Sequence, residues 1–249
     1  MYNLVIDRGN HSTKVYVFSG DKIVKTEITE GSLIELTAVL SSVIKEYKIS
    51  ASILSTVLGD HRDIETGLRG NNAHVTVDTQ TALPLTIKYA SQDTLGTDRI
   101  AAAVGGWQLF QPGPVLVIVA GTCITYNLVD SNANFVGGAI SPGLHMRLKA
   151  MHEFTGKLPL VSLDGEKPLI GHSTETSIRS GAVHGTTEEV RGMISAYEKV
   201  YPGLKTVISG GDGTFLAEAL KNGIFARPDL IAEGLHTILK FNVAESLTK

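Results

Sequence analysis

The sequence predicts an α/β fold of two related lobes, because one pattern of residues occurs twice. Leu4–Lys14 and Leu116–Tyr126 each begin with an apolar run of strand length, pass through a small turn at Gly9 or Gly121, and lead into a second strand-like stretch. In both halves of the chain strands come first and helices follow, which is typical of α/β proteins. Two similar hairpins in one chain indicate a duplicated fold with a cleft between its halves.

The boundary between the lobes is expected near Gln111–Pro114, where two prolines and a glycine end the preceding helix. This places the N-terminal lobe at residues 1–111 and the C-terminal lobe at residues 112–249. Each lobe then has the size of an ordinary domain and can bury its own core.

In the N-terminal lobe, apolar residues at Leu33, Leu36, Leu40 and Val43 have the spacing of one helical face. Short apolar runs bounded by turn residues predict the strands. The expected elements are strands at 3–7, 13–18 and 23–28, a helix at 33–47, strands at 51–57, 74–77 and 85–87, and a helix at 98–110.

The C-terminal lobe repeats this order of strands and helices. The expected elements are strands at 115–119, 123–129 and 134–140, a helix after Pro142-Gly143, a long helix at 174–200, a strand at 206–209, and helices at 214–220 and 229–242.

Composition excludes several classes of protein. The formal net charge of −3 gives no reason to expect a nucleic-acid partner. The single cysteine, Cys123, excludes an intrachain disulfide framework and a cysteine-rich zinc site. Neither a signal peptide nor an apolar run long enough to span a bilayer is recognisable, so we expect no membrane association and a cytoplasmic location.

The turn after the first strand is the first candidate site. Asp7 ends the strand, where its carboxylate can bind Mg²⁺ directly or through water. Gly9 and Asn10 leave room for backbone amides to approach a phosphate, and Lys14 adds a positive charge. An ordinary hairpin turn explains the Gly-Asn pair equally well. The second turn, Gly121-Thr122, favours phosphate binding, because it supplies a hydroxyl-bearing loop from the other lobe.

The segment Gly96-Thr97-Asp98-Arg99 is the second candidate, at the start of a predicted helix. A hydroxyl that attacks a phosphate needs a carboxylate to accept its proton and a cation to offset the developing charge. Asp98 and Arg99 can fill these two roles. The alternative is a helix cap beside an exposed arginine, which is a common arrangement.

Two further glycine clusters, at residues 137–143 and 209–213, lie where a strand passes into a helix. Ligands of α/β folds usually bind at such places, although ordinary turns explain each cluster as well. Neither cluster has the spacing of a Walker A or dinucleotide-binding motif.

Taken together and in this order, these segments resemble the type III pantothenate kinases, of the acetate and sugar kinase/actin superfamily. The resemblance covers nearly the whole chain. It is carried by Asp7-x-Gly9-Asn10-x-x-x-Lys14, Tyr89, Gly96-Thr97-Asp98-Arg99, Gly121-Thr122, Gly137-Gly138-x-Ile140-x-Pro142-Gly143, Thr174 with Gly181, Ser209-Gly210-Gly211-Asp212 and Pro228-Asp229-Leu230 with Gly234-Leu235.

The resemblance implies duplicated actin-like (ribonuclease H-like) lobes, each a mixed β-sheet with flanking helices, and a nucleotide cleft between them. It implies Asp98 as the base that activates pantothenate, and a homodimer that uses ATP, Mg²⁺ and a monovalent cation, K⁺ or NH₄⁺. The implied nucleotide contacts are Asp7, Gly9, Asn10, Lys14, Gly121, Thr122, Gly210 and Gly211, with Asp7 also at the Mg²⁺. The implied pantothenate contacts are Tyr89, Gly96, Thr97, Asp98 and Arg99, with Thr174 across the dimer interface.

The chain departs from the family at two positions that bear on the cation. The family has an aspartate ligand for the monovalent cation two residues before the second glycine, where this chain has Val119. Asn127 stands where the family often has Asp. Valine offers no oxygen to a cation, so we expect the monovalent-cation site to be lost.

The function implied is ATP-dependent phosphorylation of pantothenate to 4'-phosphopantothenate, the first step of coenzyme A biosynthesis. Two alternatives stay open: a kinase for another small alcohol, and a catalytically weak paralogue that acts as a pantothenate- or nucleotide-binding or regulatory protein. Asp7, Asp98 and Arg99 favour an enzyme, whereas Val119 and Asn127 favour the weak paralogue.

Overall fold

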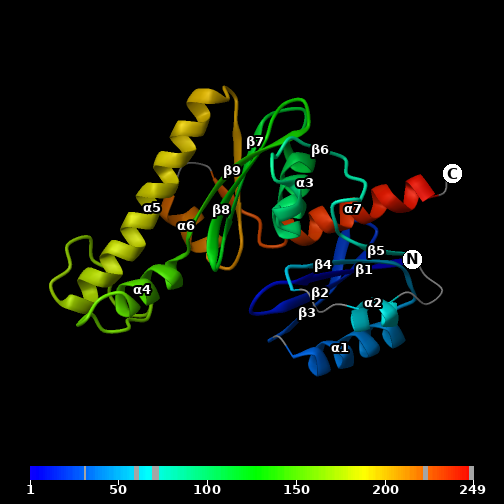
Figure 1. Cartoon of the computed structure of the whole chain (residues 1–249), viewed down its shortest axis with the longest axis horizontal. Helices are drawn as coiled ribbons and strands as arrows, with labels where there is room; N and C mark the ends of the chain where they lie inside the picture. The colour runs from blue at the N-terminus through cyan, green and yellow to red at the C-terminus, as the bar shows by residue number, and fades with distance from the viewer. Residues whose placement is uncertain (31, 59–61, 69–72, 221–223, 247–249) are drawn as a thin grey trace. The chain divides into compact units, whose positions relative to one another are not determined.

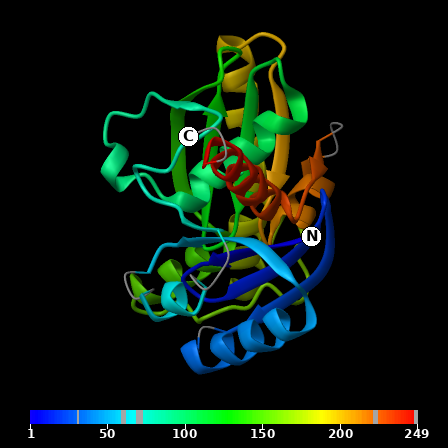
Figure 2. The same cartoon turned by 90° about the vertical axis from the view of Figure 1, so that its right-hand side faces the viewer.

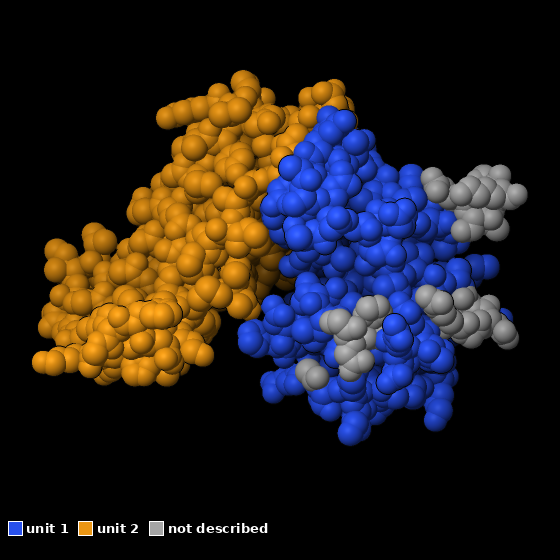
Figure 3. Space-filling model, in the orientation of Figure 1, with its two compact units in different colours: residues 1–109, 133–135, 230–249 blue, residues 110–132, 136–229 orange. Residues whose placement is uncertain are grey.

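The computed structural model describes residues 1–30, 32–58, 62–68, 73–220 and 224–246. The chain forms two compact units (Figure 3). Unit 1 comprises residues 1–109, 133–135 and 230–249, and unit 2 comprises residues 110–132 and 136–229. Packing therefore assigns the C-terminal segment to unit 1, and the division into duplicated lobes at residues 111 and 112 stays a prediction.

Unit 1 contains a five-stranded mixed sheet in the order β3-β2-β1-β4-β5. Its strands are β1 (Tyr2–Arg8), β2 (Thr13–Ser19), β3 (Lys22–Thr29), β4 (Ile49–Thr56) and β5 (Ala73–Thr76). β1 is antiparallel to β2 and parallel to β4, so the chain leaves β1 and β4 at the same edge of the sheet.

Helices cover both faces of this sheet (Figure 1, Figure 2). Successive residues of a strand point to opposite faces, and Leu4 and Ile6 share one core cluster with apolar residues of α1 (Leu33–Glu46) and α2 (Arg62–Leu68). The C-terminal helix α7 (Leu230–Ser246) packs against β1, β4 and β5. Unit 1 also contains the 3₁₀ turn η1 (Gln92–Thr94) and nearly all of the helix α3 (Thr97–Phe110).

The second sheet has the order β11-β10-β7-β8-β9-β6. Its strands are β6 (Thr86–Ile87), β7 (Val115–Ala120), β8 (Cys123–Val129), β9 (Asn134–Pro142), β10 (Lys205–Ser209) and β11 (Phe225–Ala226). β7 is antiparallel to β8 and parallel to β10, which repeats the relation of β1 to β2 and β4. The repeated hairpin read from the sequence is therefore present in both sheets.

Three helices accompany this sheet in unit 2: α4 (Leu144–Glu153), α5 (Thr174–Val200) and α6 (Gly213–Leu220). Apolar residues of α5 and α6 bury one face of β7, β8 and β10. Tyr126 is fully buried there and stacks on Tyr197 of α5, with 6.5 Å between ring centroids. α4 packs against α5 through a smaller cluster that includes Leu148 and Ile178.

The expected α/β class is confirmed, with two mixed sheets and flanking helices. Three short elements were not expected: α2, η1 and β11. α2 contributes only Ile64 and Leu68 to the core, which is too little periodicity to mark a helix in the sequence. Among the described residues, no helix combines the length and the apolar composition that crossing a bilayer requires.

Candidate active site

The C-terminal ends of β1 and β4 bring polar side chains to one edge of the sheet in unit 1. Asp7 pairs in register with Ser55 of β4 and lies opposite Lys14 across the β1–β2 ladder. The turn between β1 and β2 closes where the Gly9 N–H donates to the Ser12 carbonyl at 3.0 Å. The first predicted loop is therefore a tight hairpin with a carboxylate and an ammonium group on facing strands.

The environment of Asp7 disfavours its charged form. Burial is the largest cause, the neighbouring Asp98 carboxylate adds to it, and Lys14 partly offsets both. Together they raise the pKa of Asp7 to about 6. A partly buried carboxylate with too little compensating positive charge is a site that a cation would stabilise.

The start of α3 is fixed at the same edge. The Thr97 hydroxyl lies 2.9 Å from the Ser55 hydroxyl and donates to the Thr56 carbonyl at 3.4 Å. The carboxylate of Asp98 lies over Gly96, where a Cβ atom would be 2.4 Å from Oδ1. That Oδ1 also accepts the Arg99 backbone N–H at 2.9 Å, so Asp98 bonds to the backbone in the first turn of α3.

Arg99 is buried between aromatic rings. Its guanidinium carbon lies 5.6 Å from the centroid of the Tyr89 ring and 5.7 Å from that of Phe135. The two rings meet edge to face with 6.0 Å between centroids. Cations within about 6 Å of a ring face are attracted to it, so this pair of rings holds the guanidinium in place directly after Asp98.

In unit 2, three predicted segments converge on the end of β7. Gly143 donates its N–H to the Thr122 carbonyl at 3.1 Å, and a Cβ atom there would lie 2.0 Å from the Gly121 carbonyl oxygen. Gly210 has a φ of 93°, and a Cβ atom on it would lie 2.1 Å from the Ala120 carbonyl oxygen. Both glycines are thus required by close backbone packing, and the exposed Thr122 lies at the centre of the group.

Gly211 follows Gly210 in this group, and Asp212 donates its N–H to the Ala120 carbonyl at 3.1 Å. Burial raises the pKa of Asp212, and the nearby His145 of α4 lowers it in part. By contrast, neither Gly9 nor Gly121 has a positive φ, and the space beside Gly121 is open. A left-handed backbone conformation therefore does not account for the glycine at either position.

Val119 lies near the end of β7, in register with Thr125 of β8 and Ser209 of β10. Asn127 is fully buried and donates from Nδ2 to the Val117 carbonyl at 3.2 Å and to the Thr125 hydroxyl at 3.0 Å. Asn127 thus bonds to the β7–β8 hairpin itself.

The remaining predicted residues lie at exposed positions. Asn10 is exposed in the β1–β2 turn, and Thr174 is exposed as the first residue of α5, directly after the N-cap Ser173. No group of three or more His, Cys, Asp or Glu side chains within the described ranges is placed to hold a metal ion.

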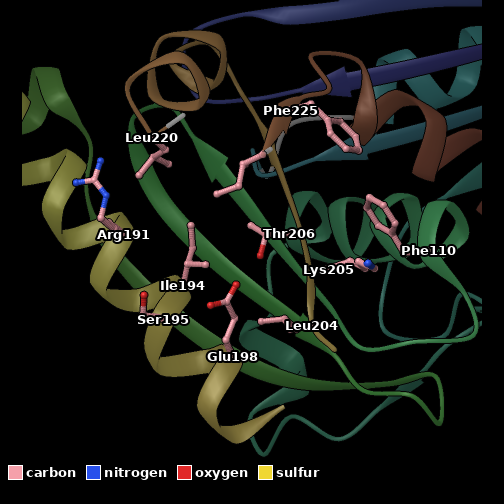
Figure 4. A pocket seen from close by; sticks show the side chains of 11 residues that line it. Phe110, Arg191, Ile194, Ser195, Glu198, Leu204, Lys205, Thr206, Leu220 and Phe225 are labelled. Atoms are coloured by element: carbon pink, nitrogen blue, oxygen red, sulfur yellow. The ribbon is translucent and has the colours of Figure 1, made fainter. Parts of the chain in front are cut away.

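A separate hollow of about 360 Å³ lies in unit 2 among α5, β10 and α6 (Figure 4). Thr206 lines it near the N-terminal end of β10, and its buried hydroxyl has no hydrogen-bond partner among the described residues. Gly210 and Gly211 follow the opposite end of the same strand. The hollow is therefore distinct from the predicted phosphate loops.

Known proteins of similar sequence match nearly the whole length of this chain. The sequence model of a family described as type III pantothenate kinase matches residues 3–196. A relative from Bacteroides fragilis is 42% identical over 243 residues, covering 96% of this chain and 98% of its own. A relative from Christiangramia forsetii is 40% identical over 241 residues, with the same two shares covered. Both are named type III pantothenate kinase. This chain belongs to the type III pantothenate kinase family.

Solved structures of other proteins show the same fold. The activator of 2-hydroxyisocaproyl-CoA dehydratase from Clostridium difficile, solved with ADPNP, matches with a TM-score of 0.57 and 13% identity over 100% of this chain and 97% of its own. A ROK family glucokinase from Streptomyces griseus matches with a TM-score of 0.54 and 14% identity, covering 97% of this chain and 99% of its own. At these identities the likeness concerns the fold, and it confirms the actin-like and sugar kinase class.

Two residues of this type III pantothenate kinase site, Ser55 and Phe135, were not predicted from the sequence. Phe135 holds Arg99 together with Tyr89, and Ser55 holds Thr97, yet each comes from a strand distant along the chain. In the sequence Ser55 reads as one more residue of a buried strand, and Phe135 reads as an ordinary core aromatic. Only the pairing of the strands reveals either contact.

Proposed function

We propose that this enzyme transfers the γ-phosphoryl group of ATP to the primary hydroxyl of pantothenate. The observation that carries the proposal is the meeting of Asp7, Lys14 and Asp98-Arg99 at one edge of unit 1, in a chain of this family. The hydroxyl oxygen forms a bond to the γ-phosphorus, the bond to the β-phosphate oxygen breaks, and ADP leaves. Asp98 accepts the hydroxyl proton, while Arg99 and Lys14 offset the negative charge.

The proposed ATP contacts in unit 1 are Asp7, Gly9, Asn10 and Lys14, which would bind phosphates. In unit 2 the proposed ATP contacts are the group around Thr122. The proposed pantothenate contacts are in unit 1 at Tyr89, Gly96, Thr97 and Arg99. The conformation of the Gly121 turn supports this division: neither φ nor packing demands a glycine there, so access for a ligand explains it best.

Mg²⁺ fits the donor set at Asp7. This ion is ordinarily held by one or two carboxylates together with substrate phosphates and waters, so a cage of protein ligands is not needed. A second carboxylate, that of Asp98, is close enough to raise the pKa of Asp7. When bound, the ion would neutralise charge on the phosphates, while Asp98 and Arg99 act on the acceptor hydroxyl.

A second candidate function rests on Val119 and Asn127. Without the carboxylate that the family places at position 119, the protein could bind pantothenate and nucleotide and turn them over slowly, or act on a different alcohol. A coupled assay for ADP release with ATP, Mg²⁺ and pantothenate separates these outcomes. Rapid release that depends on pantothenate supports the kinase, whereas binding of both ligands by calorimetry without release supports the weak paralogue.

We expect the Val119→Asp variant to gain K⁺ or NH₄⁺ dependence that the unmodified protein lacks. A monovalent cation needs several oxygen ligands, and an aliphatic side chain removes one and makes the site drier. Thr125 and Ser209 flank position 119 in register and supply neighbouring oxygens. The measurement is the rate of the coupled assay across a K⁺ series with Na⁺ holding ionic strength constant. Strong K⁺ activation of the unmodified protein would show that other oxygens complete the site.

We also propose a homodimer in the cytoplasm, with Thr174 of one protomer completing the pantothenate site of its partner. Exposed apolar side chains support this: Leu169 and Ile170, which precede Thr174 by a few residues, are 74% and 84% exposed in the single chain, and Phe154 at the end of α4 is 88% exposed. Such exposure typically marks an interface.

The Ile170→Asp variant is expected to sediment as a monomer and to lose most of its activity with pantothenate. The matched control is Val200→Asp, which places the same charge on an exposed apolar position at the far end of α5, about 40 Å from Thr174 by helix rise. Analytical ultracentrifugation decides the matter, and a fully active monomer would exclude a shared site.

A further inference from the structure

A carboxylate in the middle of α5 joins three other elements of unit 2. Glu189 Oε1 accepts the Ser141 hydroxyl at 2.5 Å and the Tyr126 hydroxyl at 3.4 Å. Its Oε2 accepts Arg147 Nη2 at 2.5 Å. These donors come from β9, β8 and α4, so one side chain ties three elements to the long helix.

Glu189 is held in its charged form. Burial would raise its pKa, but the hydrogen bonds from Ser141 and Arg147 and the positive charge of Arg147 hold the pKa of this carboxyl below its usual value. The side chains of Arg147 and Glu189 are 23% and 31% exposed. Charge-assisted bonds in such partly buried surroundings are stronger than neutral ones and fix the geometry of the guanidinium.

Arg147 also hydrogen-bonds to the Ser141-Pro142 segment. Its Nε donates to the Pro142 carbonyl at 2.8 Å, and its Nη2 donates to the Ser141 hydroxyl at 2.8 Å. The planar guanidinium thus bonds at once to Glu189, to Ser141 and to Pro142. A planar group with this many partners leaves the Ser141-Pro142 segment little freedom to move.

The next residue along the chain touches the proposed phosphate loop. The Gly143 N–H donates to the Thr122 carbonyl at 3.1 Å, and the Gly143 Cα lies too close to the Gly121 carbonyl oxygen for any side chain to fit. A displacement of Pro142-Gly143 would therefore displace the backbone of Gly121-Thr122. A continuous series of contacts therefore connects Glu189 to the Gly121-Thr122 loop, through Arg147 and Pro142-Gly143.

We propose that Glu189 is a positioning residue for the Gly121-Thr122 phosphate loop, acting through Arg147 and the Pro142-Gly143 backbone. The inference rests on the proposed function, since it concerns nucleotide binding at Thr122. Glu189 itself contacts no substrate in this scheme. Its effect is to hold the loop in the conformation that binds phosphate, so that binding does not have to order it.

The Glu189→Gln variant tests this inference, with Glu188→Gln as the matched control. Glu188 is the preceding residue of the same helix, and it forms a surface ion pair with Arg191. In Glu189→Gln an amide N–H₂ replaces a carboxylate oxygen, and the bond to Arg147 loses its charge. We expect the Kd for ADP with Mg²⁺ to rise about tenfold, the scale of a lost charge-assisted bond. The Kd for pantothenate should stay within about twofold, with both constants measured by calorimetry.

A second readout needs no ligand. The Gly143 amide should exchange with deuterium faster in Glu189→Gln than in the unmodified protein, and at an unchanged rate in Glu188→Gln. If Glu189→Gln does not fold by circular dichroism, Ser141→Ala removes one donor to the same carboxylate and should shift both readouts in the same direction by a smaller amount.

The outcomes are distinct. Equal weakening of ADP and pantothenate binding, or a Gly143 exchange rate that does not change, would show a general structural role and overturn the inference. If the unmodified protein binds no nucleotide at all, the proposed function fails and this inference fails with it. If it binds nucleotide normally and the two variants behave alike, only the inference about Glu189 fails.

Discussion

The Asp98→Asn variant is expected to turn over pantothenate at least about a hundredfold more slowly than the unmodified enzyme, which is the usual scale for a positioned general base. Its Kd for pantothenate should change little, because an amide of the same size keeps the shape of the site. The loss of turnover is expected because Asp98 lies at the sheet edge that also holds Asp7, and two aromatic rings fix Arg99 beside it.

Asparagine is the informative replacement because Asp98 also bonds to the backbone in the first turn of its own helix. Its Oδ1 accepts the Arg99 backbone N–H at 2.9 Å, and an asparagine oxygen can accept the same bond. The variant therefore removes the base and keeps this bond. Asp93→Asn is the matched control, since Asp93 is an exposed carboxylate in the adjoining 3₁₀ turn. Turnover near the unmodified rate in Asp98→Asn would show that Asp98 serves only the backbone of its own helix.

Local pattern was enough to predict most of the elements in this chain. The apolar runs at 4–6 and 115–119 fall on central strands, and the spacing from Leu33 to Val43 falls on α1. These segments are long and their burial is regular, so periodicity alone defines them. The order of motifs then identified the family, because the resemblance depends on an ordered set of residues.

Contacts between distant segments could not be predicted in the same way. Phe135 packs on Arg99, and Glu189 bonds to Ser141 and Arg147, across separations that no local pattern records. α7 follows unit 2 in sequence and yet packs with unit 1. Such contacts depend on strand order and helix packing, which a single sequence leaves open.

The Asp7→Asn variant is expected to lose at least about a hundredfold in turnover while becoming more stable at neutral pH. The loss follows from the proposed role of Asp7 at the phosphates and Mg²⁺, where an amide cannot replace a charge. The gain in stability follows from the pKa of Asp7, which burial, together with the Asp98 carboxylate, raises to about 6. Ionising this group in the folded, ligand-free protein is unfavourable, and asparagine does not ionise.

The sign of the pH dependence follows directly from this shift. The unfolded chain releases the Asp7 proton near its ordinary pKa of 3.8, whereas the folded protein keeps it until about pH 6. Between these values the folded state binds more protons, so this group's contribution to stability declines as pH rises through the window. The difference in melting temperature between Asp7→Asn and the unmodified protein should therefore be near zero at pH 4 and positive at pH 7.5.

Thermal unfolding without nucleotide or Mg²⁺, repeated across pH 4 to 8, measures this difference. Asp21→Asn is the contrasting control, because a hydrogen bond and ion pair with Lys240 lower the pKa of Asp21, which is an exposed group. The Asp21→Asn variant should have an unchanged or slightly lower melting temperature at pH 7.5, whereas that of Asp7→Asn should be higher. A melting temperature of Asp7→Asn that falls at pH 7.5 would mean that Lys14 outweighs burial and Asp98, and that the ionised carboxylate supports the fold. A stable and inactive Asp7→Asn protein would instead separate the chemistry of this carboxylate from its effect on folding.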